Sequence, residues 1–176
     1  MPILDRNAST LLVIDFQGRL MPVIEDGDAV IRNARRLLDA AAKLDVPCLF
    51  TEQNSAGLGT TVEGLLAPGP VLPKMTFDAT RSPGLLDGIP AEQAVVVAGC
   101  EAHVCVLQTV LGLLKAGRSV HVIRDAIGSR RAENKEAAIR RMERNGAEVV
   151  TTEMVVFEWL ETCEHPCFRD VVQLIK

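Results

Sequence analysis

Short apolar runs bounded by glycine, proline or charge alternate along this chain with segments whose apolar positions recur at helical spacing. Runs rich in β-branched residues are typical of strands that are buried on both faces. The sequence shows five such runs, at positions 10–16, 46–51, 94–98, 119–125 and 147–150. Apolar spacing and turn signals predict helices at positions 28–44, 102–115, 131–145, 152–160 and 166–175, with a short one at 83–86.

This alternation predicts a parallel sheet with helices on both faces, because parallel neighbours need a crossover connection. Right-handed crossovers then give a three-layer α/β/α sandwich, doubly wound, with a mostly parallel sheet of about six strands. The chain has 176 residues, 48% of them hydrophobic, and we expect one domain over positions 1–176. A long stretch rich in glycine and proline, including Pro68, ends at Lys74, and such loops are usually functional or mobile.

The stretch at 94–111 is the most informative, because a buried strand ending at Gly99 feeds a helix across a tight turn. Ligands bind at the carboxyl ends of strands in open α/β sheets, and Cys105 lies on the first turn of this helix. The free N–H groups and dipole of a helix N-terminus favour a thiolate, and the same groups can bind the oxyanion of a tetrahedral intermediate. Cys105 is therefore a candidate nucleophile.

Several segments resemble the isochorismatase-like cysteine hydrolases, and the match spans nearly the whole chain. They are LVIDFQ at 12–17 with Asp15, the isolated Lys74, and GCEAHVCV at 99–106 with Cys105. The likeness is nearest to the poorly characterised isochorismatase-domain hydrolases, through TEQ at 51–53, GLG at 57–59, EAHVCVLQ at 101–108 and EHP at 164–166. The resemblance implies an isochorismatase-like fold and a catalytic triad of Asp15, Lys74 and Cys105.

In the mechanism that the resemblance implies, Asp15 takes the proton of the Cys105 thiol, while Lys74 keeps Asp15 ionised and favours the thiolate. The backbone N–H groups of Glu101 and Cys105 form the oxyanion hole, and the Cys100–Glu101 peptide bond is cis. The isochorismatases proper lack the cysteine and cleave a vinyl ether, so Cys105 predicts an amide or related acyl substrate and a thioester intermediate. The Glu101 side chain can bond backbone donors near the helix start as readily as it can contact the substrate.

We expect Phe16, Gln53, Phe77 and His103 to line the substrate pocket. Packing alone is the competing explanation for the aromatic residues. Nicotinamidase-like members of the family carry an aspartate and histidines around a metal near the second strand. Here that region reads TEQNS at 51–55 and the histidines are scattered, so we expect neither a metal nor a cofactor.

The five cysteines are odd in number and irregularly spaced, which predicts reduced thiols rather than a disulfide framework. Cys163, His165 and Cys167 crowd three possible ligands into a span unlike usual zinc spacing. A helix entrance or a subunit contact is the simpler interpretation of these residues.

Charge and hydropathy limit the kinds of partner that we expect for this protein. The formal net charge is -4, and no dense Lys/Arg run with interleaved aromatics occurs, so we expect no nucleic-acid partner. The N-terminus lacks the features of a secretory signal, and polar residues interrupt the most apolar stretch at 94–114. We therefore predict a cytoplasmic protein without membrane contact, a small-molecule substrate and a homo-oligomer.

These observations favour a cysteine hydrolase that cleaves a small amide or related acyl compound. Two alternatives remain open. In one, the protein is redox-active, and Cys105 is oxidised and resolved by Cys100. In the other, it is a binding or scaffold protein that has kept the fold without activity.

Overall fold

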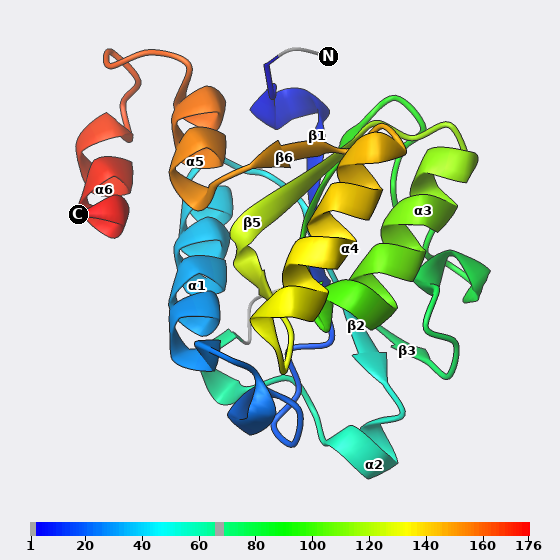
Figure 1. Cartoon of the computed structure of the whole chain (residues 1–176). Helices are drawn as coiled ribbons and strands as arrows, with labels where there is room; N and C mark the ends of the chain where they lie inside the picture. Colours follow the sequence, from blue (N-terminus) through cyan, green and yellow to red (C-terminus); the bar gives the residue numbers. More distant parts are fainter. Residues whose placement is uncertain (1–2, 66–68) are drawn as a thin grey trace.

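The computed structural model describes residues 3–65 and 69–176 (Figure 1). Its centre is a six-stranded parallel sheet with the order β3-β2-β1-β4-β5-β6. The order reverses between β1 and β4, which makes this pair the topological switch point. The doubly wound parallel sheet predicted from the sequence is confirmed. The strands are β1 (Ser9–Ile14), β2 (Cys48–Gln53), β3 (Val71–Lys74), β4 (Ala94–Cys100), β5 (Val120–Gly128) and β6 (Glu148–Val150).

Helices cover both faces of the sheet and complete the three layers (Figure 1). On one face lie α1 (Gly27–Lys43), α5 (Thr152–Leu160) and α6 (Phe168–Val172). On the other lie α3 (Leu107–Lys115) and α4 (Ala132–Arg144). A π-helical turn (Ala102–Val106) leads into α3, and α2 (Ser55–Leu58) is a single turn beyond β2. Short 3₁₀ turns lie at Arg6–Ala8, Met21–Val23, Glu63–Leu65, Ala79–Arg81 and Gln173–Ile175.

The side chains of β1 point alternately into two hydrophobic cores, one on each face of the sheet. Leu11 and Val13 pack in the core on the α1 side, whereas Leu12 and Ile14 pack in the core on the α3 side. None of the four is more than 1% exposed. Because both faces of the strand are buried, its sequence is a continuous apolar run without polar alternation.

β3 lies within the stretch that was predicted to be an irregular loop, so that part of the prediction is wrong. The strand has four residues and pairs with β2 at the edge of the described sheet. Pro73 has no N–H to donate, and an edge strand tolerates this because one of its sides has no ladder to form. Pro68, which belongs to the same predicted loop, lies outside the described residues.

The short helix predicted at 83–86 is also wrong, because this segment forms turns. Gly84 has a φ of +89°, a left-handed conformation that ends a right-handed helix. The helical turn nearby is the 3₁₀ turn Ala79–Arg81, where the Asp78 carboxylate accepts a hydrogen bond from the Thr80 N–H at 2.9 Å.

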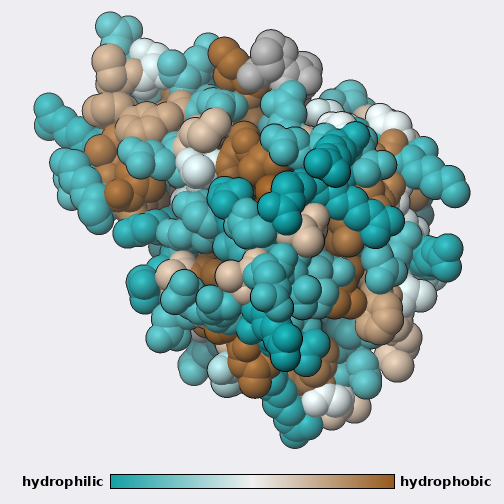
Figure 2. Space-filling model, in the orientation of Figure 1, coloured by the Kyte–Doolittle hydropathy of each residue, from teal (hydrophilic) through white to brown (hydrophobic). Residues whose placement is uncertain are grey.

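Hydrophilic side chains cover most of the face shown in Figure 2, and hydrophobic ones appear as separate patches between them. Among the exposed large hydrophobic residues are Met75 and Phe77, which follow β3 and are 72% and 51% exposed. None of the helices in the described part of the chain combines the length and the apolar character needed to cross a membrane.

Candidate active site

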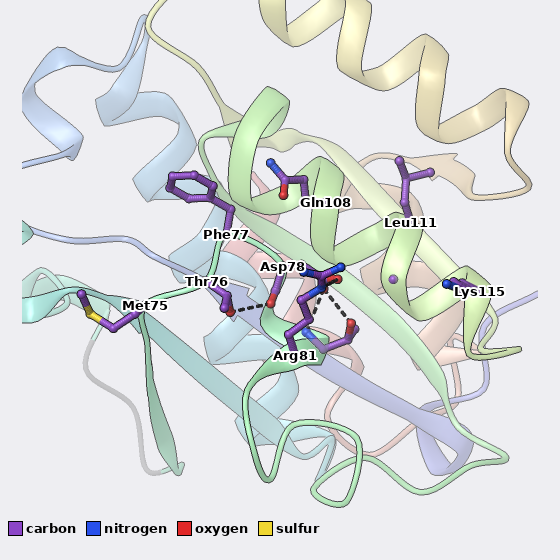
Figure 3. A pocket seen from close by; sticks show the side chains of 10 residues that line it. Met75, Thr76, Phe77, Asp78, Arg81, Gln108, Leu111 and Lys115 are labelled. Carbon is purple, nitrogen blue, oxygen red and sulfur yellow. Dashed lines mark hydrogen bonds and ion pairs between the residues drawn. The ribbon is translucent and has the colours of Figure 1, made fainter.

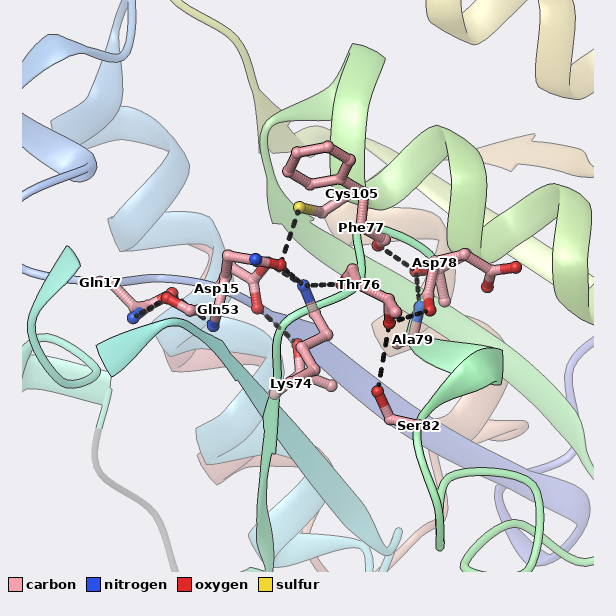
Figure 4. Close-up of polar contacts among 12 residues, drawn as sticks. Asp15, Gln17, Gln53, Lys74, Thr76, Phe77, Asp78, Ala79, Ser82 and Cys105 are labelled. Atoms are coloured by element: carbon pink, nitrogen blue, oxygen red, sulfur yellow. Dashed lines mark hydrogen bonds and ion pairs between the residues drawn. The ribbon is translucent and has the colours of Figure 1, made fainter. Parts of the chain in front are cut away.

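The candidate site lies at the carboxyl edge of the sheet, where four neighbouring strands end. Asp15 follows β1, Gln53 and Lys74 are the last residues of β2 and β3, and Glu101 follows β4. Cys105 belongs to the π-helical turn that comes next. Figure 4 shows Asp15, Gln53, Lys74 and Cys105 pointing toward one another. Residues distant in the sequence meet here because parallel strands end at the same edge.

Asp15 is fully buried, and both of its carboxylate oxygens are held. Its φ is +52°, a left-handed conformation that aspartate adopts more readily than most residues. Oδ1 accepts a hydrogen bond from Thr51 Oγ1 at 2.7 Å, and Oδ2 accepts one from Lys74 Nζ at 2.6 Å. Thr51 is opposite Ile14 in the sheet register, so β2 places its hydroxyl beside Asp15.

Lys74 has a side chain that is 0% exposed, yet its ammonium group is fully partnered. Nζ donates to Asp15 Oδ2 at 2.6 Å, to Gln53 Oε1 at 2.8 Å and to Thr76 O at 3.3 Å. An ammonium has three donors, and each one has an acceptor here. Such partners are needed because burial costs several kcal/mol per ion.

Gln53 is fixed in one orientation between Lys74 and Cys105. Its Nε2 donates to Met75 O at 2.8 Å, which leaves Oε1 facing Lys74 Nζ. Gln17 holds the backbone at this point, because its Oε1 accepts from the Gln53 N–H at 2.8 Å and its Nε2 donates to Gln53 O at 3.0 Å. Gln17 thus positions the end of β2.

Cys105 is 6% exposed, and its Sγ lies 4.0 Å from Gln53 Oε1 (Figure 4). Burial, and after it the negative charge of Asp15, raise the pKa of the Cys105 thiol to about 12 against the lowering effect of Lys74. In the resting site, burial therefore outweighs any stabilisation of a thiolate by the helix terminus. The sulfur is held as a neutral thiol, and a base has to remove its proton before it can attack.

Glu101 directly precedes the π-helical turn, and the Cys100–Glu101 peptide bond is cis. The Glu101 carbonyl accepts hydrogen bonds from the N–H groups of Val104 at 3.0 Å and Val106 at 3.2 Å. Its carboxylate Oε2 accepts from both the backbone N–H and the Nε of Arg130, each at 3.0 Å. The side chain thus joins the end of β4 to the segment that follows β5.

Gly99 allows β1 and β4 to approach closely just before the site. A Cβ atom at this position would lie 2.6 Å from both the carbonyl oxygen and the Cβ of Ile14. Any larger residue would displace the end of β1 and Asp15 with it. The absence of a side chain at Gly99 therefore allows the end of β1 to hold the Asp15 carboxylate near the π-helical turn that follows β4.

A cavity of about 330 Å³ contains Cys105 and Asp15 in its wall. Gln53 and Phe77, two of the four residues predicted for the pocket, also line it. The full set of lining residues is Asp15, Arg19, Leu20, Val23, Gln53, Leu58, Phe77, Glu101, Val104, Cys105 and Arg130. A small molecule in this cavity would therefore reach both the thiol and the carboxylate.

Phe16 and His103 are not among the residues that line this cavity. Phe16 is 1% exposed and packs in the core on the α1 side, whereas Cys105 packs on the α3 side. The left-handed turn at Asp15 accompanies this change of direction. His103 Nδ1 instead makes a hydrogen bond of 3.0 Å with Ser129 Oγ, which draws the ring toward the end of β5.

A second hollow, of about 720 Å³, lies between the segment 75–81 and α3 (Figure 3). It shares Phe77 with the first cavity, but its lining includes neither Asp15 nor Cys105. The Arg81 Nε at its side lies 3.7 Å from Asp78 Oδ2. Because the reactive groups line the smaller cavity, the smaller one is the candidate active site.

The cysteines and histidine near the C-terminus form a local turn. His165 Nδ1 accepts a hydrogen bond from the Cys167 N–H at 3.1 Å, and Cys163 is exposed. Across residues 3–65 and 69–176, no group of three or more His, Cys, Asp or Glu side chains is placed to bind a metal ion. The helix entrance suggested by the sequence describes this segment, since α6 begins directly after Cys167.

Among the residues of the site that were not anticipated from the sequence, three are polar or charged. Thr51 is one of them, and the parallel register of β1 and β2 was the signal that could have revealed it. Arg19 and Arg130 are the others, and both line the cavity. Their only sequence signal is a position just after a predicted strand, which is shared by many surface residues.

Together, these features define a class, the doubly wound α/β proteins that carry an ion pair and a thiol at the switch point of the sheet. The chain belongs to the Isochorismatase domain family, whose model matches residues 9–154. It is 36% identical to the isochorismatase domain-containing protein 2A of Mus musculus over 172 residues, which are 96% of this chain and 83% of that protein. The family expected from the sequence is thus confirmed.

Solved structures agree with this assignment. The MAR1 ribonuclease of Caenorhabditis elegans superposes with a TM-score of 0.92 at 37% sequence identity, over 98% of this chain and 92% of that one. YcaC of Escherichia coli, described as an octameric hydrolase of unknown specificity, superposes with a TM-score of 0.88 at 23% identity, over 98% and 96% of the two chains. The second likeness supports the fold alone.

Proposed function

We propose that this protein is a cysteine hydrolase that cleaves a small amide or related acyl compound through a thioester on Cys105. One observation carries the proposal: a thiol lines a cavity beside a buried carboxylate that is paired with an ammonium group. The charges of Asp15 and Lys74 act on the thiol in opposite directions, since Asp15 raises its pKa and Lys74 lowers it. Nucleophile, base and orienting cation are the elements that covalent acyl transfer requires.

The first half of the reaction forms the thioester. Asp15 takes the thiol proton as the sulfur attacks the acyl carbon, since a thiol with a pKa of about 12 is not ionised beforehand. A C–S bond forms, and the C–N bond of the substrate breaks. Asp15 then returns the proton to the departing nitrogen, which leaves as an amine or ammonia.

The second half restores the enzyme. Asp15 accepts a proton from a water molecule, whose oxygen attacks the thioester carbon. A C–O bond forms and the C–S bond breaks, and Asp15 gives its proton to the Cys105 sulfur. The products are a carboxylic acid and the neutral thiol, so no oxidant or reductant is consumed.

The oxyanion of each tetrahedral intermediate needs donors that are already in place. We assign this role to the backbone N–H groups of Glu101, which directly precedes the π-helical turn, and of Cys105, which lies within it. Backbone donors fixed before the reaction stabilise developing charge without reorganisation. The position of the turn at the carboxyl end of β4 supports this assignment.

The redox alternative is less well supported by the packing of the two thiols. Cys100 is 0% exposed and belongs to the core on the α1 side, whereas Cys105 belongs to the core on the α3 side. A disulfide needs Cβ atoms that approach within about 4.5 Å and point toward each other. The placement of the two side chains in different cores therefore counts against a Cys100–Cys105 disulfide.

A substrate screen tests the proposal. Wild type and Cys105→Ala are incubated in parallel with small amides, carbamoyl compounds, vinyl ethers and a single-stranded RNA, the last because of the name of the C. elegans relative. Turnover of an amide or carbamoyl compound by wild type alone supports the proposal. Turnover that persists in Cys105→Ala, or cleavage of RNA alone, contradicts it. Cys163→Ala is the matched control, because Cys163 is an exposed thiol outside the cavity.

We also propose that the protein forms a homo-oligomer. Met75 and Phe77 expose apolar surface next to the candidate site, and contact between copies would bury it. The octameric state of E. coli YcaC is compatible with this. Light scattering at dilute concentration decides the matter, because a mass of several times 19.1 kDa supports the proposal and a mass of 19.1 kDa contradicts it.

A further inference from the structure

The π-helical turn that carries Cys105 is tied at two points to the residues that follow β5. Glu101 Oε2 accepts hydrogen bonds from the backbone N–H and the Nε of Arg130, each at 3.0 Å. His103 Nδ1 makes a second link, a hydrogen bond of 3.0 Å with Ser129 Oγ. These two pairs, Glu101–Arg130 and His103–Ser129, are called the clasp below. Their side chains have no part in the proposed reaction steps.

The Glu101 carboxylate does not cap the turn that it precedes. A polar side chain at this position commonly accepts a hydrogen bond from the free N–H groups of the first turn. Among the described residues, Glu101 makes no such bond, and its carboxylate reaches the segment after β5 instead. Glu101 is 7% exposed, and a buried carboxylate is stable only when it is paired and hydrogen-bonded. The carboxylate therefore serves the link between the two segments.

The segment on the other side of the clasp is itself fixed. Gly128, the last residue of β5, is opposite Cys100 in the sheet register, so the residues that follow it lie beside the π-helical turn. Ser129 is 2% exposed, and its carbonyl accepts from the Glu25 N–H at 3.0 Å. Glu25 Oε2 in turn accepts from the Ala132 N–H at 2.7 Å. A side chain bonded to this segment is therefore held against a rigid part of the molecule.

The turn that the clasp holds departs from a regular α-helical ladder. The Glu101 carbonyl accepts from the N–H groups of Val104 at 3.0 Å and Val106 at 3.2 Å, so this pattern passes over Cys105 between them. Donors of an oxyanion hole work only when they are held within about 0.5 Å of the productive geometry. A turn with irregular internal bonding therefore benefits from support by another element.

We propose that the clasp positions the backbone N–H groups of Glu101 and Cys105 for the oxyanion. In this role the Glu101 carboxylate and Ser129 are positioning residues, because each holds the turn and neither has to contact the substrate. The inference rests on the proposed function, since it assumes that Cys105 attacks an acyl carbon. Breaking the clasp should slow acyl transfer and leave the intrinsic reactivity of the sulfur in place.

Two reagents that differ in whether an oxyanion forms test the inference. With p-nitrophenyl acetate, the Cys105 sulfur forms a C–S bond with the acetyl carbon through a tetrahedral intermediate, Asp15 takes the thiol proton, and p-nitrophenolate leaves. With iodoacetamide, the same sulfur displaces iodide directly, and no oxyanion forms.

The acylation rate is the kcat/KM of p-nitrophenolate release by each variant, less that of the same variant with Cys105→Ala. This quantity reports the first half of the reaction even when the thioester is then hydrolysed. The alkylation rate of Cys105 by iodoacetamide is measured by peptide mass spectrometry. The ratio of acylation rate to alkylation rate separates the oxyanion hole from the reactivity of the thiol.

We expect this ratio to fall about tenfold in Glu101→Ala and about threefold in Ser129→Ala, because a looser turn places the donors less accurately. Glu101→Gln should restore most of the ratio, since its amide oxygen can still accept from Arg130. Glu136→Ala is the matched control and should keep the wild-type ratio, because Glu136 forms an exposed pair with Arg124 and does not line the cavity. If Glu101→Ala fails to fold, Ser129→Ala, which removes no charge, provides the test.

The possible failures are distinguishable. A wild-type ratio in both Glu101→Ala and Ser129→Ala overturns the positioning role and leaves Cys105 as the nucleophile. A parallel fall of both rates has the same meaning, because a merely structural role lowers them together. If wild type is alkylated at Cys105 but releases no more p-nitrophenolate than Cys105→Ala, the oxyanion hole fails and the positioning role fails with it. If Cys105 reacts with neither reagent, the proposed function itself is contradicted.

Discussion

Cys100 and Cys105 are both buried and close in sequence, but their surroundings differ. Cys100 packs in the core on the α1 side, next to Gly128, where a Cβ would lie 3.3 Å from its sulfur. Burial raises the pKa of both thiols. Cys105 lines the cavity together with Asp15, whereas Cys100 is not among the residues that line it. Burial alone therefore does not distinguish a structural thiol from a reactive one, whereas a base and space for a substrate do.

The largest expected effect separates these two cysteines. Cys105→Ala should lower turnover by at least about a thousandfold, because the nucleophile is lost. Cys100→Ala should keep turnover within a few-fold and lose about 1 kcal/mol of unfolding free energy from the emptied core position. Steady-state rates and urea denaturation of both variants measure this. Equal loss of activity in the two variants would remove the distinction between them.

Lys74→Met tests how much the Asp15–Lys74 ion pair beside Cys105 contributes to stability and to turnover. It should lower the unfolding free energy by about 3–5 kcal/mol, because Asp15 is left buried without a counter-charge. Turnover should fall about a hundredfold. Lys43→Met, at the exposed end of α1, is the matched control and should change neither quantity appreciably. Adding Asp15→Asn to Lys74→Met should restore part of the stability; if the double variant is less stable than the single one, unpaired charge is not the cause.

Gly99→Ala acts on the strand end that carries Asp15. The added Cβ would lie 2.6 Å from Ile14 O, so we expect a loss of about 1–3 kcal/mol in unfolding free energy together with reduced turnover. Gly64→Ala is the control, because nothing lies within 4 Å of a Cβ there. Thermal denaturation of the two variants compares them. Similar midpoints of thermal denaturation in the two variants would show that β1 and β4 can move apart without loss of stability.

The smallest expected effect is the several-fold change in Cys105 labelling at a fixed pH when the charge of Asp15 is removed. Its pKa of about 12 means that labelling by iodoacetamide should rise about tenfold per pH unit from pH 7 to 10 without a plateau. Asp15 raises this pKa, so Asp15→Asn should lower it and increase labelling several-fold at a fixed pH while it abolishes turnover. Slower labelling in Asp15→Asn would contradict the electrostatic assignment, as would a plateau near pH 8 in wild type.

The sequence predicted well those elements whose burial is continuous. The β1 and β4 runs and the helix at 152–160 were recognisable because apolar patterning and turn residues agree. β3 could not be recognised, since it is short and contains Pro73, and only its pairing with β2 makes it a strand. Its existence depends on tertiary structure rather than on local preference.

The candidate site likewise combines features that the sequence indicates with features that depend on tertiary structure. Asp15, Lys74 and Cys105 were expected to converge from the resemblance, and the structure places them together. The neutral state of the thiol was not foreseeable, because it depends on how deeply the sulfur is buried and how near Asp15 lies. Arg19 and Arg130 were missed for a similar reason, since their place in the cavity depends on hydrogen bonds to carbonyl groups and to Glu101 that no local pattern announces.

Trapping the covalent intermediate tests the central claim most directly. The first amide that the screen identifies is mixed with wild type, the reaction is quenched during turnover, and the protein is digested and analysed by mass spectrometry. We predict a mass increase equal to the acyl group on the peptide that contains Cys105, removed by hydroxylamine as expected for a thioester. Turnover with the adduct on any other residue, or undiminished turnover in Cys105→Ala, would contradict the account.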